Sequence, residues 1–279
     1  MISKEEIKLK ARQHGLNPTT IEKDYVLGWI LLAISEHSVL SQEWVFKGGT
    51  CLKKSYFDDY RFSEDCDFTL LNEINATIPN VQSAMNEIAL WITKKSGIAI
   101  DINRSLFETV TNAANQTIIQ GRIFYNAPMS PHSPRQWPRI KFDLTSHEKL
   151  VFSPEKRNIY HNYSDNSTFT NNQISCYNFY DIFSEKIRAL FERTRPRDLY
   201  DVVEISKRSL DYNVETLRAA LKEKCKFKGI SILDPNNLTW DLCESSWEAQ
   251  LSHQVRDLGS FSDYKNNFDK FFVTSCLKL

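Results

Sequence analysis

Apolar side chains in the first forty residues recur with the spacing of an α-helix. They predict one helix over Ile2–His14 and a second over Ile21–Ser38, joined at Asn17-Pro18-Thr19. Thr19 or Thr20 is expected to be the N-cap of the second helix. The apolar stripe of the second helix is broad enough to pack against a sheet; it comprises Ile21, Tyr25, Val26, Trp29, Ile30, Leu32 and Ala33.

In the middle of the chain, apolar and polar side chains begin to alternate, which is the pattern of β-strands. A helix is predicted over Val81–Lys95, followed by strands at Gly97–Ile102, Thr117–Tyr125 and Pro138–Thr145. The segment Asn126–Trp137 contains three prolines and is expected to be a loop, either a mobile flap or a hairpin connection. A helix followed by alternating strands indicates a mixed α/β core.

The second half of the chain predicts a different kind of structure. Residues 150–173 are rich in Asn, Ser and Thr and are expected to connect two lobes. His147, just before this segment, and His161, within it, are expected to be surface histidines. After this segment the apolar spacing is helical, and Pro196 separates two helices within Asp181–Glu204. We therefore expect an α/β (α+β) core with a mixed sheet over residues 1–165 and a mainly helical lobe over residues 166–279.

Residues 45–68 carry the pattern with the clearest chemistry. A strand ending at Phe46 enters a Lys47-Gly48-Gly49-Thr50 turn, a helical piece follows, and Asp65 and Asp67 stand on the next strand. Paired glycines let the backbone approach a phosphate closely, and residues two apart on a strand share one face. Neighbouring carboxylates suit Mg²⁺, which binds one or two carboxylates together with substrate phosphates. This order of features indicates nucleotidyl or phosphoryl transfer.

The same stretch resembles a known family. KGGT-x-L-x-K followed by RFSEDxDF is similar to the AbiEii/AbiGii-type nucleotidyltransferases, which belong to the polymerase-beta-like nucleotidyltransferase superfamily. Thr50 stands where the superfamily commonly has Ser, and residues 51–64 form a spacer that fits the AbiEii branch. The EKDY segment, Glu22–Tyr25, also resembles a recurring feature of the family. Since it falls in the first turn of a helix, where acidic side chains suit the helix dipole, we favour that role for it over a direct role in the active site.

A second motif strengthens the resemblance. The family pattern E-K-hydrophobic-x-A-L-x-x-R-x-x-x-R-D-x-x-D is matched by Glu185, Lys186, Ala189, Leu190, Arg193, Arg197, Asp198 and Asp201. Lysine suits a triphosphate as a point charge, and arginine binds phosphate oxygens through paired donors. By resemblance, Lys186 would contact nucleotide phosphate and Asp198 would be essential, positioning Lys186 or the base and sugar.

The superfamily commonly takes a third carboxylate from a neighbouring strand. Asp143 shares a face with Lys141 and Thr145 and is our candidate, with Asp101 as the rival. Such a carboxylate completes the metal site or deprotonates the attacking hydroxyl. The predicted ligands of Mg²⁺ (or Mn²⁺) are thus Asp65, Asp67 and Asp143.

The resemblance also implies substrates and partners. An NTP would lie in the cleft between the lobes, with Asp65, Asp67, Asp143, Lys186 and Asp198 as the catalytic residues. The acceptor would be an RNA, plausibly a tRNA 3′ end, and its modification would block translation. The protein would be the toxin of a toxin–antitoxin or abortive-infection pair active in phage defence, with an antitoxin as partner. The predicted nucleotide-binding residues are Lys47, Gly48, Gly49, Thr50, Lys53, Arg61, Ser63, Lys186, Arg193 and Arg197.

Two other functions use the same residues. A metal-dependent phosphohydrolase or nuclease would need the same carboxylates, and a nucleotide- or RNA-binding protein without activity would keep the fold. The presence of every expected carboxylate counts against loss of activity.

Composition adds few constraints. Lys and Arg number 35, as do Asp and Glu, so an RNA contact must come from a local patch. The best local candidate is a basic run around Phe227, although such runs are often only solvated faces; it comprises Arg218, Lys222, Lys224, Lys226 and Lys228. Six cysteines without a C-x-x-C pair argue against a zinc site and a disulfide framework. The absence of a signal region or a long apolar run predicts a cytoplasmic protein without a membrane anchor.

Overall fold

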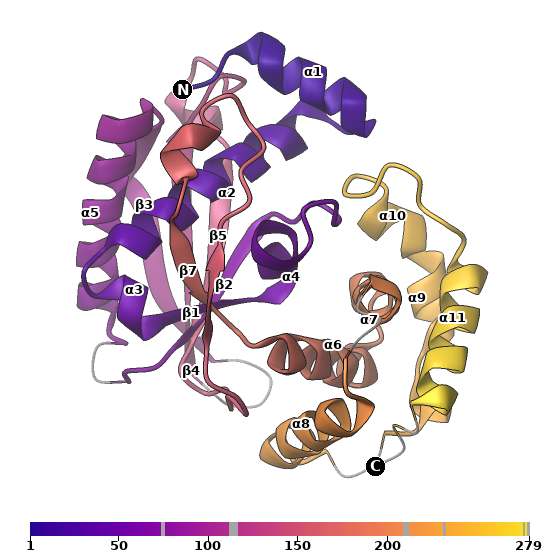
Figure 1. Ribbon diagram of the computed structural model, residues 1–279. Helices are drawn as coiled ribbons and strands as arrows, with labels where there is room; N and C mark the ends of the chain where they lie inside the picture. The colour runs from indigo at the N-terminus through magenta and orange to yellow at the C-terminus, as the bar shows by residue number, and fades with distance from the viewer. Residues whose placement is uncertain (74–75, 112–116, 209–211, 231–232, 276, 278–279) are drawn as a thin grey trace. The chain divides into compact units, whose positions relative to one another are not determined.

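The chain forms two structural units. The computed structural model describes residues 1–73, 76–111, 117–208, 212–230, 233–275 and 277. The first unit comprises Met1–Glu148 and Pro154–Cys176, and the second comprises Lys149–Ser153 and Tyr177–Leu279 (Figure 1). The five cysteines among the described residues are buried free thiols, and Cys276 lies outside the described residues.

Two helices open the first unit, as predicted. Helix α1 spans Lys4–His14 and α2 spans Pro18–Glu36. The expected N-cap was wrong: Asn17 caps α2 by accepting a hydrogen bond from the Thr19 backbone N–H, at 3.0 Å. Pro18 then occupies the first turn, where its missing N–H costs nothing, so both threonines lie inside the helix.

A mixed seven-stranded sheet, formed within the described residues, is the centre of the first unit. The strand order is β3-β4-β5-β2-β1-β7-β6. The β2–β5 and β1–β7 pairs are parallel, and the other neighbouring strands are antiparallel, which confirms the predicted mixed α/β core. The strands are β1 Trp44–Lys47, β2 Asp65–Leu70, β3 Ala99–Thr111, β4 Thr117–Asn126, β5 Arg139–Thr145, β6 Glu155–Asn158 and β7 Gln173–Cys176.

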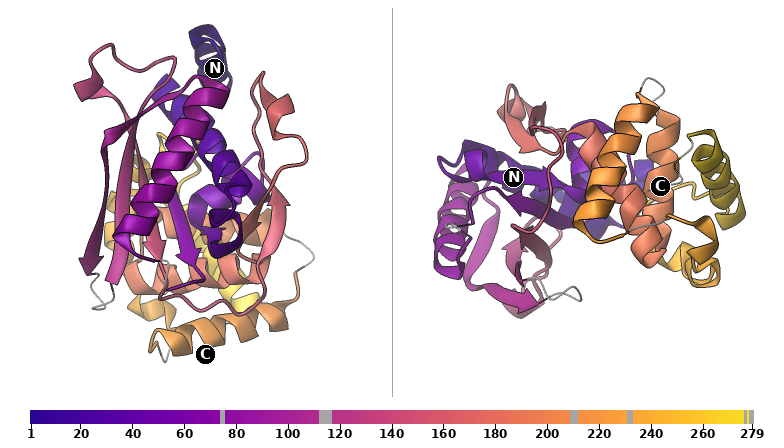
Figure 2. Two further views of the ribbon diagram at one scale, coloured as in Figure 1. Left: turned by 90° about the vertical axis from the view of Figure 1, so that its left-hand side faces the viewer. Right: turned by 90° about the horizontal axis from the view of Figure 1, so that it is seen from below.

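The two faces of this sheet differ in character. Helices α2, α3 (Leu40–Glu43) and α5 (Ile78–Ser96) lie against one face (Figures 1 and 2). Alternate residues of β4 and β5 are buried on that side, including Ile123 and Phe142. The residues between them, such as Lys141 and Asp143, point to the opposite face. The sheet therefore presents a polar face on which chemistry can take place.

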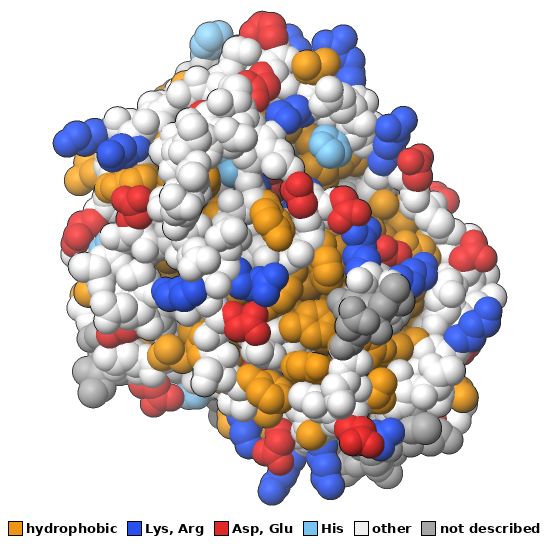
Figure 3. All heavy atoms as spheres, viewed as in Figure 1, with side chains coloured by type: hydrophobic (Ala, Val, Ile, Leu, Met, Phe, Trp, Pro, Cys, Tyr) orange, Lys and Arg blue, Asp and Glu red, His pale blue; other side chains and the backbone are white. Residues whose placement is uncertain are grey.

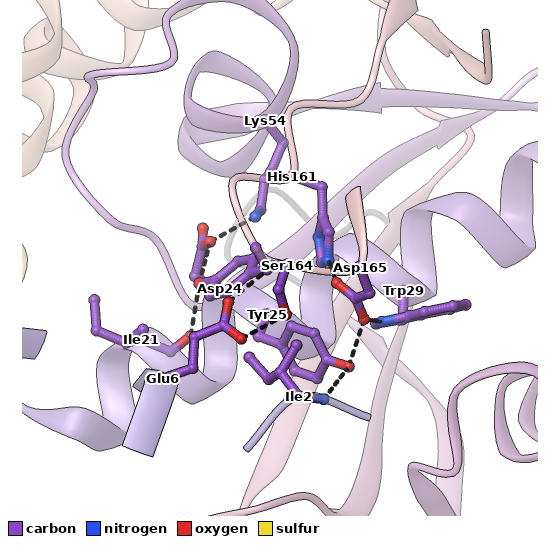
Figure 4. Close-up of polar contacts among 11 residues, drawn as sticks. Ile2, Glu6, Ile21, Asp24, Tyr25, Trp29, Lys54, His161, Ser164 and Asp165 are labelled. Carbon is purple, nitrogen blue, oxygen red and sulfur yellow. Dashed lines mark hydrogen bonds and ion pairs between the residues drawn. The ribbon is translucent and has the colours of Figure 1, made fainter. Parts of the chain in front are cut away.

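The segment over residues 150–173 is more than a connection. It contains β6 and ends as β7 begins, and β7 pairs with β1 at Phe46 and Cys176. His161 is buried and stacks on Phe169, with ring centroids 3.7 Å apart. It also hydrogen-bonds to Asp165 at 2.9 Å (Figure 4). Burial lowers the pKa of His161. Its prediction as a surface histidine was wrong, because it also packs against Tyr25 and Trp29 of α2, more than 130 residues earlier in the chain. His147 is half-buried.

Glu22 and Asp24 lie after the first turn of α2, which begins at Pro18, and both are buried. Asp24 forms an ion pair with Lys54 at 2.6 Å and accepts a hydrogen bond from the Tyr163 hydroxyl at 2.9 Å (Figure 4). Glu22 accepts hydrogen bonds from the backbone N–H of Met129 and from the Ser130 hydroxyl, which ties the proline-rich loop to α2. The favoured interpretation of EKDY as a charged first turn that interacts with the helix dipole was therefore wrong, since both carboxylates serve tertiary contacts.

The second unit is helical in the part that the structure describes. Its core is aromatic, with Phe183 stacked on Phe271 and Tyr200 stacked on Tyr264. Asp181 accepts hydrogen bonds from the backbone N–H groups of Val151 and Phe152, at 3.0 and 2.9 Å. The longer helices are α6 Phe179–Arg193, α7 Pro196–Arg208, α8 Val214–Phe227 and α11 Phe261–Thr274, with the short α9 Trp240–Ser245 and α10 Trp247–Leu251 between them.

The basic run on α8 is not a continuous exposed face. Lys222 and Lys226 are exposed, but Lys224 is buried and pairs with Asp181 at 3.0 Å. On the face seen in Figure 3, basic and acidic side chains are interspersed, in keeping with the balanced composition. Among the helices that the described residues form, none has the length and apolarity needed to cross a bilayer.

Candidate active site

The glycine turn places a backbone surface directly beside a carboxylate. Lys47 ends β1 opposite Asp67, and Gly48 follows with φ of +80°, which favours glycine. A Cβ on Gly48 would overlap Oδ2 of Asp67, and one on Gly49 would lie 2.7 Å from the Arg61 guanidinium. The two glycines therefore allow a carboxylate and a guanidinium to approach the same turn.

The short helix α4, Gly48–Cys51, is fixed to the neighbouring strand. The Thr50 hydroxyl donates a hydrogen bond to the backbone carbonyl of Asp65. Oγ of Ser63 also lies near Gly49, 3.4 Å from the position that a Cβ there would take. Gly48, Gly49, Thr50, Arg61 and Ser63 are thus brought together around the turn, as the sequence motif predicts.

Three carboxylates stand on two neighbouring strands. Asp65 and Asp67 share a face of β2, and the parallel register places Asp143 of β5 directly opposite Asp67. The Gln120 side-chain amide donates a hydrogen bond to Oδ1 of Asp143, at 2.9 Å. Gln120 was not singled out in the sequence, because only the register of β4 with β5 brings it to Asp143.

Asp101, the rival third carboxylate, lies elsewhere on the sheet. It stands on β3, opposite Phe124 of β4, so two strands separate it from β2. Its Oδ1 accepts a hydrogen bond from the backbone N–H of Arg104, at 3.2 Å. Strand order therefore favours Asp143 as the partner of Asp65 and Asp67.

The second predicted group lies in the helical unit. Lys186 of α6 forms an ion pair with Asp201 of α7 at 2.8 Å, and Asp201 is fully buried. Asp198 instead receives two hydrogen bonds from Arg193, from Nε at 2.6 Å and from Nη2 at 2.7 Å. A direct contact of Asp198 with Lys186, one of two roles expected for it, is therefore not formed. The sequence pattern contained Asp201, three residues after Asp198, but its pairing with Lys186 was missed.

The chain that carries these two groups of residues can be compared with known proteins. A family model described as "Nucleotidyl transferase AbiEii toxin, Type IV TA system" matches residues 29–272, which is most of the chain. The chain belongs to the AbiEii family. It is accordingly a nucleotidyltransferase, and the family is that of the toxins of type IV toxin–antitoxin systems, which implies an antitoxin partner.

The fold of this AbiEii chain is shared by a solved structure. MenT4, the nucleotidyltransferase toxin Rv2826c from Mycobacterium tuberculosis H37Rv, is similar with a TM-score of 0.66 and 15% sequence identity. The similarity covers 99% of this chain and 90% of MenT4. Comparison with curated protein sequences gives no match. The mixed α/β fold is therefore similar to that of a known nucleotidyltransferase toxin.

The carboxylates fit a metal of the Mg²⁺ type. Within the described ranges, no three His, Cys, Asp or Glu side chains form a ready-made metal cage. Mg²⁺ does not need one, because it keeps several waters and binds through one or two carboxylates and the substrate's phosphates. Asp67 and Asp143 stand directly opposite each other, and a cation would relieve the repulsion between them.

Lys53 and Lys54, adjacent in the first motif, have different interaction partners. Lys53, predicted to bind nucleotide, donates a hydrogen bond to the backbone carbonyl of Asp58, and its ammonium lies 4.7 Å from the centre of the Phe62 ring. It lines a small cavity of about 50 Å³ together with Asp24 and Lys54. Lys54 is the lysine that the family motif specifies. Its buried side chain forms an ion pair with Asp24 and is not exposed to a nucleotide. It was omitted from the predicted site.

Replacing Gly48 by alanine is expected to lower nucleotidyl transfer by about 100-fold. The added Cβ would displace the Asp67 carboxylate, and a misplacement of about 1 Å in an active site costs roughly this factor. The measurement is the initial rate of transfer by the purified variant.

Gly97→Ala is the matched control. Gly97 has almost the same φ, +78°, but the nearest atom to its added Cβ would be 3.9 Å away. Both variants place alanine at a left-handed φ, so equal losses of activity in the two would contradict the role of the Gly48–Asp67 contact.

Proposed function

We propose that this AbiEii chain transfers a nucleoside monophosphate from an NTP to an RNA acceptor in the presence of Mg²⁺ (or Mn²⁺). The supporting observation is the register that sets Asp143 beside Asp67, on the face where Asp65 also lies and where the glycine turn ends. Three carboxylates beside a phosphate-binding turn suit an enzyme that transfers a phosphoryl group better than a protein that only binds a nucleotide or RNA.

Asp65, Asp67 and Asp143 would hold the metal. When bound, Mg²⁺ would neutralise charge on the transferred phosphate and on the leaving group. Asp143 would accept the proton of the attacking hydroxyl, and its hydrogen bond from Gln120 would keep one carboxylate oxygen oriented. The hydroxyl oxygen bonds to the α-phosphorus, the bond between that phosphorus and the bridging oxygen to the β-phosphate breaks, and pyrophosphate leaves.

Each of the two motifs has side chains suited to the phosphates of an NTP. Around the turn, Arg61 and Ser63 would accompany Gly49 and Thr50 at the phosphates. Lys186 would supply a point charge, with Asp201 holding its ammonium in place. Arg197 would neutralise the triphosphate further, and the pairing of Arg193 with Asp198 would support this segment.

The biological role we propose follows the family. Modification of a tRNA 3′ end would prevent aminoacylation and stop translation, which is a plausible means of toxicity in abortive infection and phage defence. An antitoxin would relieve it, and the site of action would be the cytoplasm. These proposals rest on the family match.

The test uses purified protein, Mg²⁺, total cellular RNA and each of the four NTPs carrying label on the α-phosphate. We expect label in a discrete small RNA, with pyrophosphate as the other product and no label with the Asp65→Asn/Asp67→Asn variant. Release of inorganic phosphate with unlabelled RNA would instead indicate a phosphohydrolase. Thermal stabilisation by an NTP without turnover would indicate a binding protein.

A further inference from the structure

The polar face of the sheet carries an ordered set of charges beside the carboxylates. In one row across the strands, Asp65 of β2 stands opposite Lys141 of β5, and Lys141 stands opposite Arg122 of β4. In the next row, Asp143 lies between Asp67 and Gln120. Asp65, Asp67 and Asp143 thus stand on β2 and β5, the cations Lys141 and Arg122 on β5 and β4, and Glu108 of β3 lies opposite Gln120.

Two of these cations are placed against each other. Arg122 and Lys141 are directly opposite on antiparallel strands, an arrangement of like charges that destabilises a sheet. Arg139 lies two residues before Lys141 and shares its face. In the part of the chain that the structure describes, no carboxylate forms an ion pair with any of the three. A bound anion would offset their repulsion.

The cations border a groove large enough for a nucleotide unit. The groove has a volume of about 260 Å³, and its lining includes Arg122, Arg139 and Lys141 together with Asp65 and Asp143. Leu106, which is 45% exposed, adds an apolar surface, while Glu108 contributes a further acidic side chain. A groove with both cations and an exposed apolar side chain suits a single nucleic-acid strand, whose phosphates and bases need these two kinds of contact.

Strand order separates this groove from the glycine turn. The turn follows β1, on one side of β2, whereas β5 and β4 lie on the other side. The carboxylates of β2 and β5 thus lie between the proposed triphosphate site and the cationic groove. In phosphoryl transfer the attacking and leaving oxygens are roughly in line on opposite sides of the phosphorus, so the acceptor must approach from the side away from the leaving pyrophosphate.

We propose that this groove binds the 3′ end of the RNA acceptor as a single strand. Arg122, Arg139 and Lys141 contact the phosphates nearest the 3′ end, Leu106 contacts a base, and the terminal hydroxyl points toward Asp143. Neighbouring strands are about 4.8 Å apart, so Lys141 and Arg122 lie about 5 and 10 Å across the sheet from Asp65, within reach of those phosphates. This inference rests on the proposed transfer to RNA and assigns its acceptor subsite.

The test measures RNA binding separately from catalysis. A short fluorescent single-stranded RNA of mixed sequence with a free 3′ hydroxyl is titrated with the full chain without NTP. For Arg122→Gln/Lys141→Gln we expect affinity about tenfold lower, and a slope of log K against log salt that is smaller by about 0.7 for each phosphate that the variant no longer neutralises. The KM for RNA rises, and the KM for NTP stays unchanged.

Three further variants complete the test. Lys94→Gln removes an exposed cation from α5, which lies against the other face of the sheet, and should leave RNA affinity unchanged. Leu106→Ser should weaken RNA binding without changing the salt slope, whereas Leu90→Ser, at an exposed leucine of α5, should not weaken it.

Two results would overturn the proposal. One is RNA binding by Arg122→Gln/Lys141→Gln equal to that of the wild type. The other is a rise in the KM for NTP alone, which would mean that these cations hold the triphosphate. Failure of the proposed function has a different signature, because the wild type would then label no RNA at all with any NTP.

Discussion

Asp67→Asn is expected to reduce nucleotidyl transfer by about 1000-fold while leaving the protein folded. Asparagine keeps the shape of the side chain but removes the negative charge that would hold Mg²⁺ between β2 and β5. A metal contributes several kcal/mol of charge stabilisation in the transition state, and each 1.4 kcal/mol is a factor of ten in rate. The measurement is the rate of label transfer at equal protein concentration, with circular dichroism to establish folding.

The pair Asp143→Asn and Asp101→Asn serves as the comparison for this prediction. Asp143 lies beside Asp67, so its variant should lose activity to a similar extent. Asp101 caps the backbone N–H of Arg104, two strands from β2, and its variant should retain activity within a few-fold of the wild type. Wild-type activity in Asp67→Asn, or a larger loss in Asp101→Asn than in Asp143→Asn, would disprove the metal assignment.

Asp24→Ala is expected to lower the free energy of unfolding by about 3–5 kcal/mol. The substitution leaves the ammonium of Lys54, whose side chain is only 2% exposed, without its buried partner, and such an uncompensated charge costs this much. It also removes the acceptor of the Tyr163 hydroxyl. The measurement is urea denaturation, in which the midpoint should fall while the slope m stays the same.

The charge of Asp24 also gives this contribution a defined pH dependence. Burial alone would raise the pKa of Asp24, but the ammonium groups of Lys54 and Lys53 and hydrogen bonds from Lys54 and Tyr163 lower it below its ordinary value. A carboxyl with a lowered pKa stabilises the folded state above its unfolded pKa of about 3.8, and this stabilisation is lost as the pH falls through the folded pKa. The difference between wild type and Asp24→Ala should therefore be constant near neutral pH and shrink in acid.

A double variant separates the charge effect from a general loss of packing. In Asp24→Leu/Lys54→Met both charges are gone, and buried ion pairs can often be replaced by apolar residues of similar size at little cost. We expect this variant to recover a large part of the stability lost in Asp24→Ala. If the double variant were as unstable as Asp24→Ala, the cost would come from altered packing rather than from an unpaired lysine.

The sequence by itself determined the local features of the active site. Alternation along a strand requires Asp65 and Asp67 to share a face, and the glycine pair after the strand that ends near Phe46 predicts a tight turn. These relations are local, since they depend only on residues a few positions apart. For the same reason the two motifs identified the AbiEii family, which the family match confirmed.

Only the tertiary structure decided which distant residues meet. The register of β5 with β2 favoured Asp143 over Asp101, and the register of β4 with β5 placed Gln120 and Arg122 beside the carboxylates. Strand pairing joins segments separated by tens of residues, and no local periodicity encodes the order of strands in a sheet. The cationic groove, which depends on that order, could not be seen in the sequence.

The same limit explains the charges that were assigned to the surface. Asp24, His161 and Lys224 are each buried against residues far away in the chain: Asp24 against Lys54, His161 against Tyr25 and Trp29 of α2, and Lys224 against Asp181. A charged side chain is buried only when a specific partner compensates the loss of water. The sequence determines which side chains can form such pairs, and the packing of strands and helices decides which of them do.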